Sequence, residues 1–249
     1  MDLHGKNVLI TGSARRIGRE IAIKLARSGA CLLLHYNHSE SQARSLKKEI
    51  ESLSAKALLF RCDLSPRGKP LVSTLQTFFK QLNRAVPRID ILINNASVFY
   101  PTPFGKITEK DWDHFMTVNL KAPFFLSQAV GQRMLRQKSG KIINLLDAAV
   151  SRPQADYLPY AISKAGLWTA TAGLAKALAP YVQVNGIAPG PILPSKGMTP
   201  RGRRAIVKKT LLKRFGHPED IAEAVRFLIE GTDFITGTVI PVDGGMSHV

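Results

Sequence analysis

A tyrosine and a lysine stand four residues apart in the segment PYAISKAG, as Tyr160 and Lys164. On a helix this spacing places both side chains on one face, about one turn apart. A nearby ammonium group favours the phenolate form of a tyrosine, whose pKa is normally about 10. Such a pair can exchange a proton with a substrate near neutral pH. Because amphipathic surface helices often show the same spacing, the pair needs support from other residues.

A carboxylate supports the pair. Asp147 lies at the end of the strand-like run KIINLLD, ahead of Tyr160 in the chain. In open sheets of parallel strands, ligands bind beyond the carboxyl ends of the strands. We therefore expect Asp147 at the same site as Tyr160 and Lys164.

A glycine turn follows the first strand-like run, in the segment TGSARRIG at residues 11–18. Gly12 permits a tight turn, and Gly18 permits a close approach of helix and strand. The amino terminus of the following helix offers free N–H groups and a positive dipole to a pyrophosphate. Because the turn joins a strand to a helix at the start of a βαβ unit, it predicts a dinucleotide site rather than an ordinary turn.

The end of the second strand-like run bears on the choice of dinucleotide. A site that prefers NAD usually has Asp or Glu there, bound to the ribose 2′-hydroxyl, whereas this chain has HYNHS at residues 35–39. Without a carboxylate, a 2′-phosphate can accept hydrogen bonds from His38 and Ser39, and Arg16 can compensate its charge. The sequence therefore predicts NADPH as the cofactor.

The ends of the next two strand-like runs are expected beside the same cofactor. Asp63 ends the third run and is placed near the adenine, while Asn94, Asn95 and Ala96 end the fourth. The two asparagines are equally compatible with simple turn formation, because Asn favours turns in general.

Short apolar runs alternate with amphipathic stretches along the whole chain, a pattern that predicts βαβ units and a parallel sheet. The later helices are expected at about residues 68–84, 108–137, 159–178 and 218–230. The longest irregular stretch, about residues 190–204, is of a kind that is often functional. We predict an α/β fold: a single Rossmann-like, doubly wound domain over residues 1–249, with a seven-stranded, mainly parallel sheet and helices on both faces.

Composition restricts the class of protein. The chain has no apolar run of about 18 residues and no signal-peptide pattern, so we expect a soluble, cytoplasmic protein without membrane contact. Cys31 and Cys62 lie in apolar runs, which argues against a disulfide or a metal site. Thirty-five Lys and Arg against eighteen Asp and Glu leave a net charge of +17, and many of these cations lie in residues 196–214. They form either a solvated basic face or a surface that attracts anions.

Several motifs together resemble the short-chain dehydrogenase/reductase family from end to end: TGxxxRxG, NNAS, VNGIAPG and PVDGG. The usual catalytic quartet of that family, Asn, Ser, Tyr and Lys, corresponds to Asn119, Asp147, Tyr160 and Lys164, so that aspartate replaces serine. The resemblance implies an NADPH-dependent oxidoreductase. Its expected cofactor contacts are Gly12, Arg15, Arg16, Ile17, Gly18, His35, Asn37, His38, Ser39, Asp63, Leu64, Asn95, Ala96, Ser97, Lys164, Pro189, Gly190 and Ile192.

Three departures from the common family pattern resemble the pteridine reductases and the dihydromonapterin reductases. Arg16 replaces a glycine, Asp147 replaces the serine, and Ser97 stands where glycine is usual. The resemblance implies that Phe99 covers a pterin ring, although Phe99 is also compatible with a core position. The expected substrate contacts are Ser97, Phe99, Asp147 and Tyr160.

The aspartate favours a pterin over a ketone for a physical reason. A carboxylate accepts hydrogen bonds from the N–H groups of an aminopterin edge or relays protons, whereas an ionised Asp147 would repel the oxyanion that develops on a ketone. A protonated Asp147 would still donate a hydrogen bond to a carbonyl. We therefore expect hydride transfer from NADPH to a pterin, with Tyr160 as proton donor.

Two other classes of function stay open. A 3-oxoacyl-[acyl-carrier-protein] reductase, or another NADPH-dependent carbonyl reductase, would share this fold, and its acidic carrier would be attracted by a basic protein. An NADPH-sensing or nucleic-acid-binding module would retain the cofactor fold without turnover; retention of Asn119, Tyr160 and Lys164 argues against it. The expected partner is a small-molecule pterin rather than nucleic acid, and the family resemblance implies a homotetramer.

Overall fold

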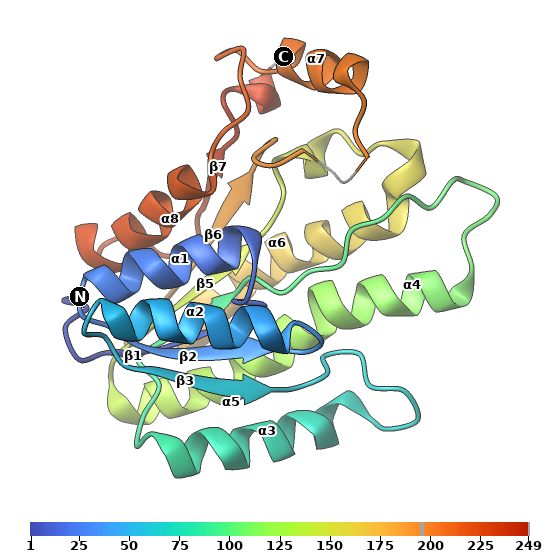
Figure 1. Ribbon diagram of the computed structural model, residues 1–249. Coiled ribbons are helices and arrows are strands. Elements are labelled where there is room, and N and C mark those ends of the chain that lie inside the picture. Colours follow the sequence, from blue (N-terminus) through green and yellow to red (C-terminus); the bar gives the residue numbers. More distant parts are fainter. Residues whose placement is uncertain (195–196, 249) are drawn as a thin grey trace.

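The computed structural model describes residues 1–194 and 197–248, and these contain a seven-stranded sheet with the order β3-β2-β1-β4-β5-β6-β7 (Figure 1). Every pair of neighbouring strands is parallel. The order reverses between β1 and β4, which is where open α/β sheets bind ligands. The strands are β1 (Asn7–Ile10), β2 (Cys31–Tyr36), β3 (Ala57–Arg61), β4 (Ile91–Asn94), β5 (Gly140–Leu145), β6 (Val182–Pro189) and β7 (Val239–Val242).

The strands are continuous apolar runs because both faces of the sheet are covered. Val8, Leu9 and Ile10 of β1 are fully buried, yet Val8 and Ile10 belong to the core on one face and Leu9 to the core on the other. Successive strand side chains point to opposite faces, so a strand buried on both sides has no polar alternation.

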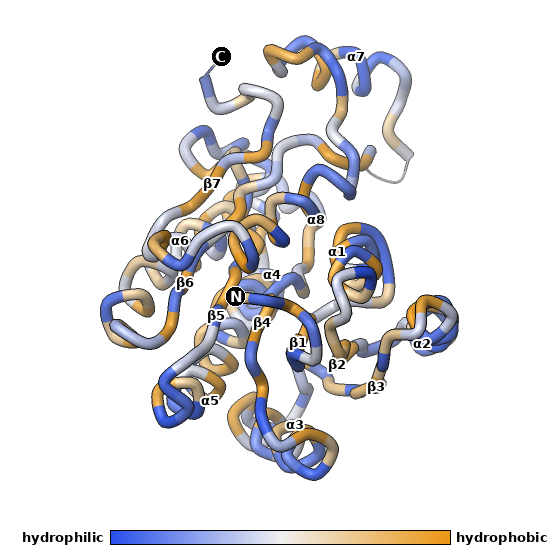
Figure 2. Tube along the Cα trace, turned by 90° about the vertical axis from the view of Figure 1, so that its left-hand side faces the viewer, coloured by the Kyte–Doolittle hydropathy of each residue, from blue (hydrophilic) through white to orange (hydrophobic). Residues whose placement is uncertain are grey.

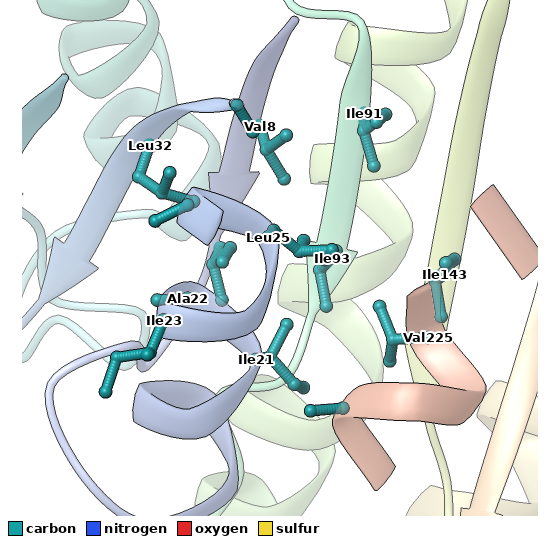
Figure 3. Packing of buried hydrophobic residues seen from close by; sticks show 14 of the residues in the cluster. Val8, Ile21, Ala22, Ile23, Leu25, Leu32, Ile91, Ile93, Ile143 and Val225 are labelled. Carbon is teal, nitrogen blue, oxygen red and sulfur yellow. The ribbon is translucent and has the colours of Figure 1, made fainter. Parts of the chain in front are cut away.

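Helices cover both faces. On one face α1 (Arg16–Arg27), α2 (Glu40–Ser52) and α8 (Pro218–Arg226) pack on the sheet, and Figure 3 shows Ile21 and Leu25 of α1 beside Val225 of α8 over the strands. The other face is covered by α3 (Leu71–Ala85), α5 (Ala122–Gln137) and α6 (Leu158–Leu178). Most of these helices alternate between hydrophilic and hydrophobic residues at each turn (Figure 2), as expected for elements that bury one side. The predicted α/β fold is therefore confirmed, and the sheet is parallel in all its pairings.

The predicted helices recur with small shifts. The stretch predicted at 108–137 consists of α4 (Glu109–Met116), a π-helical turn at Thr117–Lys121, and α5. Thr108 begins this unit with a capping box, because its side chain accepts a hydrogen bond from the backbone N–H of Asp111. The helix predicted at 218–230 is α8 followed by a second π-helical turn, Phe227–Gly231.

One expectation about the basic segment was wrong. The irregular stretch expected at 190–204 ends earlier, because Pro200–Lys208 forms a helix, α7. Thr199 caps it by accepting a hydrogen bond from the backbone N–H of Gly202 at 3.1 Å, and Pro200 occupies its first turn. The predicted basic run begins at Lys196, which lies outside the described residues.

Across residues 1–194 and 197–248, the structure has no helix of the length and hydropathy that spanning a bilayer requires. The same residues hold no group of three or more His, Cys, Asp or Glu side chains arranged for a metal ion.

Candidate active site

A cavity of about 2020 Å³ lies beyond the carboxyl ends of the strands. It brings together residues from segments that are far apart in the sequence, from Gly12 to Met246. Of the residues predicted for cofactor, substrate and catalysis, Asn94 and Asn119 do not line it. Those that do are Gly12, Arg15, Arg16, Ile17, Gly18, His35, Asn37, His38, Ser39, Asp63, Leu64, Asn95, Ala96, Ser97, Phe99, Asp147, Tyr160, Lys164, Pro189, Gly190 and Ile192.

The glycine turn forms a cradle that a side chain would fill. A Cβ atom at Gly12 would lie 2.9 Å from Cα of Ala96, and one at Gly18 would lie 2.5 Å from the carbonyl oxygen of Gly12. Gly12 also has a φ of 62°, a conformation that glycine adopts without strain. These two positions therefore fit the backbone approach that a dinucleotide pyrophosphate requires at the start of α1.

Hydrogen bonds fix this turn to the end of β4. The hydroxyl of Thr11 accepts from the backbone N–H groups of Asn95 and Ala96, both at 3.0 Å. The side chain of Asn95 donates to the carbonyl oxygens of Thr11 at 2.9 Å and Gly12 at 3.0 Å. The side chain of Asn94 instead points to the face of the sheet covered by α5, where it donates a hydrogen bond to the hydroxyl of Ser127. The expectation that Asn94 lies beside the cofactor was therefore wrong, because successive strand residues face opposite sides.

His35 holds the turn from the side of β2. Its Nδ1 accepts a hydrogen bond from the backbone N–H of Gly12 at 3.0 Å, so its Nε2 carries the proton and donates to the carbonyl oxygen of Cys62 at 3.0 Å. The ring is buried and packs edge-on against Phe78. Burial lowers the pKa of His35 to about 4, so the ring is neutral at pH 7. His35 lines the cavity, but the contacts that we observe position the glycine turn.

The expected 2′-phosphate side of the cavity carries an exposed arginine, an exposed histidine and a serine hydroxyl. Arg16 and His38 are exposed, and Ser39 begins α2 without using its side chain as a cap. The side chain of Asn37 donates to Asp63 at 3.0 Å, and the same carboxylate oxygen accepts from the backbone N–H of Ser65. The loop after β3 is therefore tied to the loop after β2.

The proton-transfer residues meet at the opening of α6. The hydroxyl of Tyr160 donates to Oδ2 of Asp147 at 2.7 Å, and Oδ1 accepts from the backbone N–H of Ala149 at 2.7 Å. Lys164 is buried and donates to the carbonyl oxygen of Leu145 at 2.8 Å, with its ammonium 5.9 Å from the centre of the Tyr160 ring. The three predicted residues are thus adjacent, with both carboxylate oxygens of Asp147 engaged.

The electrostatics differ from the sequence-based expectation. Burial raises the pKa of Tyr160 well above its ordinary value, and the neighbouring Asp147 carboxylate raises it further. Burial also lowers the pKa of Lys164 to about 8, against the opposing effect of Asp147. The prediction that Lys164 brings the pKa of Tyr160 toward neutrality was therefore wrong, because burial and the adjacent Asp147 carboxylate both raise that pKa. Tyr160 is held as the protonated phenol, the form that donates.

Two aromatic rings form a platform beside this group. Phe99 is 54% exposed, so it is not a core aromatic, and it stacks on Tyr157 with a centroid distance of 4.8 Å and an interplanar angle of 6°. The rings of Phe99 and Tyr160 meet edge to face, with a centroid distance of 4.8 Å. Sequence reasoning missed Tyr157, although its position three residues before Tyr160 at the start of a helix is a usable signal.

Asn119 supports the platform from behind. It is fully buried in the π-helical turn, where its side-chain carbonyl accepts from the backbone N–H of Val98 at 2.8 Å and from the Ser97 hydroxyl at 3.1 Å. Its amide donates to the carbonyl oxygen of Val98 at 3.1 Å and to Ser163 at 3.2 Å. The contacts described here make Asn119 a positioning residue for the segment that carries Phe99.

The far wall comes from the end of β6. A Cβ atom at Gly190 would lie 2.5 Å from Cα of Asp243, so the chain can pass here only with glycine. Ile192 follows and is buried in the core cluster that also includes residues of α8 and β7. Pro189, Gly190 and Ile192 therefore form a rigid wall of the cavity.

Comparison with known proteins decides the family. A family model described as enoyl-(acyl carrier protein) reductase matches residues 12–247. The chain belongs to the short-chain dehydrogenase/reductase family. It is 33% identical to the 3-oxoacyl-[acyl-carrier-protein] reductase of Thermotoga maritima over 99% of both chains, and 36% identical to that of Aquifex aeolicus over 98% of both. It is also 31% identical to the 5-keto-D-gluconate 5-reductase of Escherichia coli, over 98% of this chain and 96% of that one.

Membership makes the chain an oxidoreductase of a family that typically uses NADP(H). The names of these relatives are those of carbonyl reductases. They support the 3-oxoacyl alternative better than the pterin interpretation, and they give no support to a pteridine reductase resemblance.

The buried neutral His35 predicts acid sensitivity of the fold. An unfolded histidine titrates near 6.5 and the folded one near 4, so the unfolded state binds more protons between these values. The free energy of unfolding should therefore fall as the pH drops through this window, by up to about 3 kcal/mol from this residue. Urea unfolding at several pH values measures how the free energy of unfolding depends on pH. His35→Gln, which retains an acceptor and a donor, should show a smaller slope; parallel slopes would contradict this role.

Proposed function

We propose that the protein is an NADPH-dependent reductase of a pterin ring, such as a dihydropterin, dihydrofolate or an oxidised pterin. The observation that carries the proposal is the 2.7 Å hydrogen bond from the Tyr160 hydroxyl to the Asp147 carboxylate. In a carbonyl reductase of this family the residue in place of Asp147 is usually a serine, which donates to the substrate oxygen. An ionised carboxylate has no proton to donate and would repel a developing oxyanion.

A pterin offers what this site can bind. Its ring is flat and aromatic, and the exposed face of Phe99, backed by Tyr157, is an aromatic surface suited to stacking. Its amino and amide N–H groups are donors, and Asp147 supplies carboxylate acceptors beside Tyr160. The Ser97 hydroxyl lines the same cavity and adds a further polar contact.

Proton delivery follows from the arrangement of Tyr160, Asp147 and Lys164. Because its pKa is raised, Tyr160 keeps its proton until a ring nitrogen approaches. After transfer, the Asp147 carboxylate is placed to relay a proton taken up from solvent to the Tyr160 oxygen. The ammonium of Lys164, held by the carbonyl of Leu145, lies close enough to stabilise negative charge on the Tyr160 oxygen once the proton has left.

The residues present fit a bound NADPH. Gly12 and Gly18 leave room for its pyrophosphate, and Arg16, His38 and Ser39 are free to bind a 2′-phosphate. When bound, the cofactor supplies the hydride from its nicotinamide ring. The wall of Pro189, Gly190 and Ile192 restricts where that ring can lie.

A second candidate is reduction of a 3-oxoacyl thioester. The relatives named above favour it, and the net charge of +17 suits an acidic carrier protein. Under this alternative Asp147 must be protonated in the complex, so that it donates a hydrogen bond to the substrate carbonyl.

We also propose a homotetramer, as the family resemblance implies. Trp112, Phe124, Ile162 and Trp168 of α4, α5 and α6 are each 37–45% exposed, and burying them between subunits would remove apolar surface from water. Native mass spectrometry of the purified chain tests this.

Replacing Asp147 by Ser separates the two candidates. We expect the kcat/KM for a 7,8-dihydropterin to fall by about 100-fold or more, because the site loses its carboxylate acceptor and proton relay. Activity toward a 3-oxoacyl thioester should rise or stay the same, and the Kd for NADPH should not change. Stopped-flow and steady-state NADPH oxidation measure both. Unchanged pterin turnover would remove Asp147 from the mechanism.

Tyr160→Phe tests the proton donor. The ring packing survives this change, whereas the hydroxyl is lost, so turnover should drop by roughly 100-fold or more with little change in Tm. An active Tyr160→Phe enzyme would mean that another group supplies the proton.

Arg16→Gly tests the choice of cofactor. Arg16 has a φ of 55°, so glycine fits its backbone without strain and any effect comes from the lost side chain. The Kd for NADPH should rise about tenfold or more while that for NADH changes little. Arg27→Ala, at the other end of α1 and outside the cavity lining, is the control for loss of an exposed cation. Equal weakening of NADPH and NADH by Arg16→Gly would assign Arg16 to the pyrophosphate or to the fold.

A further inference from the structure

Five exposed cations on α7 and just after it take no part in the proposed reaction. They are Arg201, Arg203, Arg204, Lys208 and Lys209, and none forms an ion pair with any described residue. The sequence from residue 191 to 218 contains no Asp or Glu. In Figure 1, α7 stands apart from the sheet, on the same side as the carboxyl end of β7. The positive charge of this helix is therefore available to an external anion.

One stripe of α7 faces the cavity of the candidate active site. Ile206 and Lys209, three residues apart, both line that cavity. One turn earlier, the guanidinium of Arg203 lies 5.6 Å from the ring centre of Phe215, which lines the cavity as well. Ile206 and Lys209 thus line the cavity, and Arg203 lies beside it through Phe215. None of Arg201, Arg203 and Arg204 lines the cavity itself, and Arg203 is the one of the three that packs on a lining residue among those described.

The cavity has room beyond the reacting groups. Its volume of about 2020 Å³ exceeds the roughly 300–1,000 Å³ of an ordinary ligand pocket. A dinucleotide and a bicyclic ring would occupy the parts lined by the glycine turn and by Tyr160, and Ile206 and Lys209 line another part of the same cavity. A substrate with an extension from its ring can therefore reach the two cations.

We propose that Arg203 and Lys209 bind a polycarboxylate tail attached to the reducible ring of the substrate. This inference deepens the proposed pterin reduction and rests on it. The two cations are six residues apart, or about 9 Å along the helix axis. Such spacing suits several carboxylates along an extended chain better than one compact phosphate, which needs converging donors. A docked acidic protein would instead use the outward cations Arg201 and Arg204.

The test compares substrates with and without a tail. For wild type, KM should be lower for dihydrofolate triglutamate than for 6-hydroxymethyl-7,8-dihydropterin, and rising salt should remove the difference. Arg203→Gln/Lys209→Gln should raise KM for the triglutamate roughly five- to thirtyfold with kcat unchanged, and leave the tail-free pterin unaffected. The matched control, Arg201→Gln/Arg204→Gln, removes the same charge and should change either KM less than about twofold.

Equilibrium binding separates this inference from the proposed function. Calorimetric titration of the NADP⁺-loaded protein with the same two compounds needs no turnover. If the triglutamate binds through Arg203 and Lys209 but neither compound is reduced, the tail site stands and pterin reduction fails. Equal effects of the two double variants, or equal affinity of wild type for both compounds, would overturn the tail site. Binding of an acidic acyl carrier protein that depends on Arg201 and Arg204 instead would also overturn it.

Discussion

The turn after β1 must approach the end of β4 at van der Waals distance, and the cofactor half of the site depends on this constraint. Gly12 lies so close to Ala96 that a Cβ atom cannot be added without displacing backbone. Thr11, Asn95 and His35 hold the two segments in place from three directions. Since β4 continues into the segment that carries Phe99, the same contacts set the distance between the cofactor cradle and the aromatic platform.

The fold and most of the site could be predicted because their signals are local. Apolar runs predicted the strands, and the Tyr160–Lys164 spacing placed both residues at the opening of one helix. Properties that arise only in three dimensions could not be predicted. The raised pKa of Tyr160 depends on burial and on Asp147 from another element. The stacking of Tyr157 on Phe99 joins the residue just before α6 to the loop after β4. Helix α7 was missed because it is short and rich in cations, so that its few apolar residues form no recognisable helical pattern.

Family and substrate are decided by different residues here. Identity to carbonyl reductases extends over nearly the whole chain and shows the family. Substrate class depends on few side chains, and function must be argued from the site rather than from the fold. In the proposed reaction, Asp147 accepts hydrogen bonds from a ring edge, whereas a serine in its place would donate one to a substrate oxygen. The proposed ring and tail sites then lie at Phe99 and at α7, respectively.

The most direct test of this account is NADPH oxidation by the wild-type protein, run in parallel with a 7,8-dihydropterin, dihydrofolate, an oxidised pterin and a 3-oxoacyl thioester. If Asp147 determines substrate class as argued, at least one pterin is turned over with a kcat/KM at least about 100-fold above that for the thioester. Rapid turnover of the thioester, with none of the pterins reduced, would contradict the account and show that Asp147 acts as a protonated donor to a carbonyl.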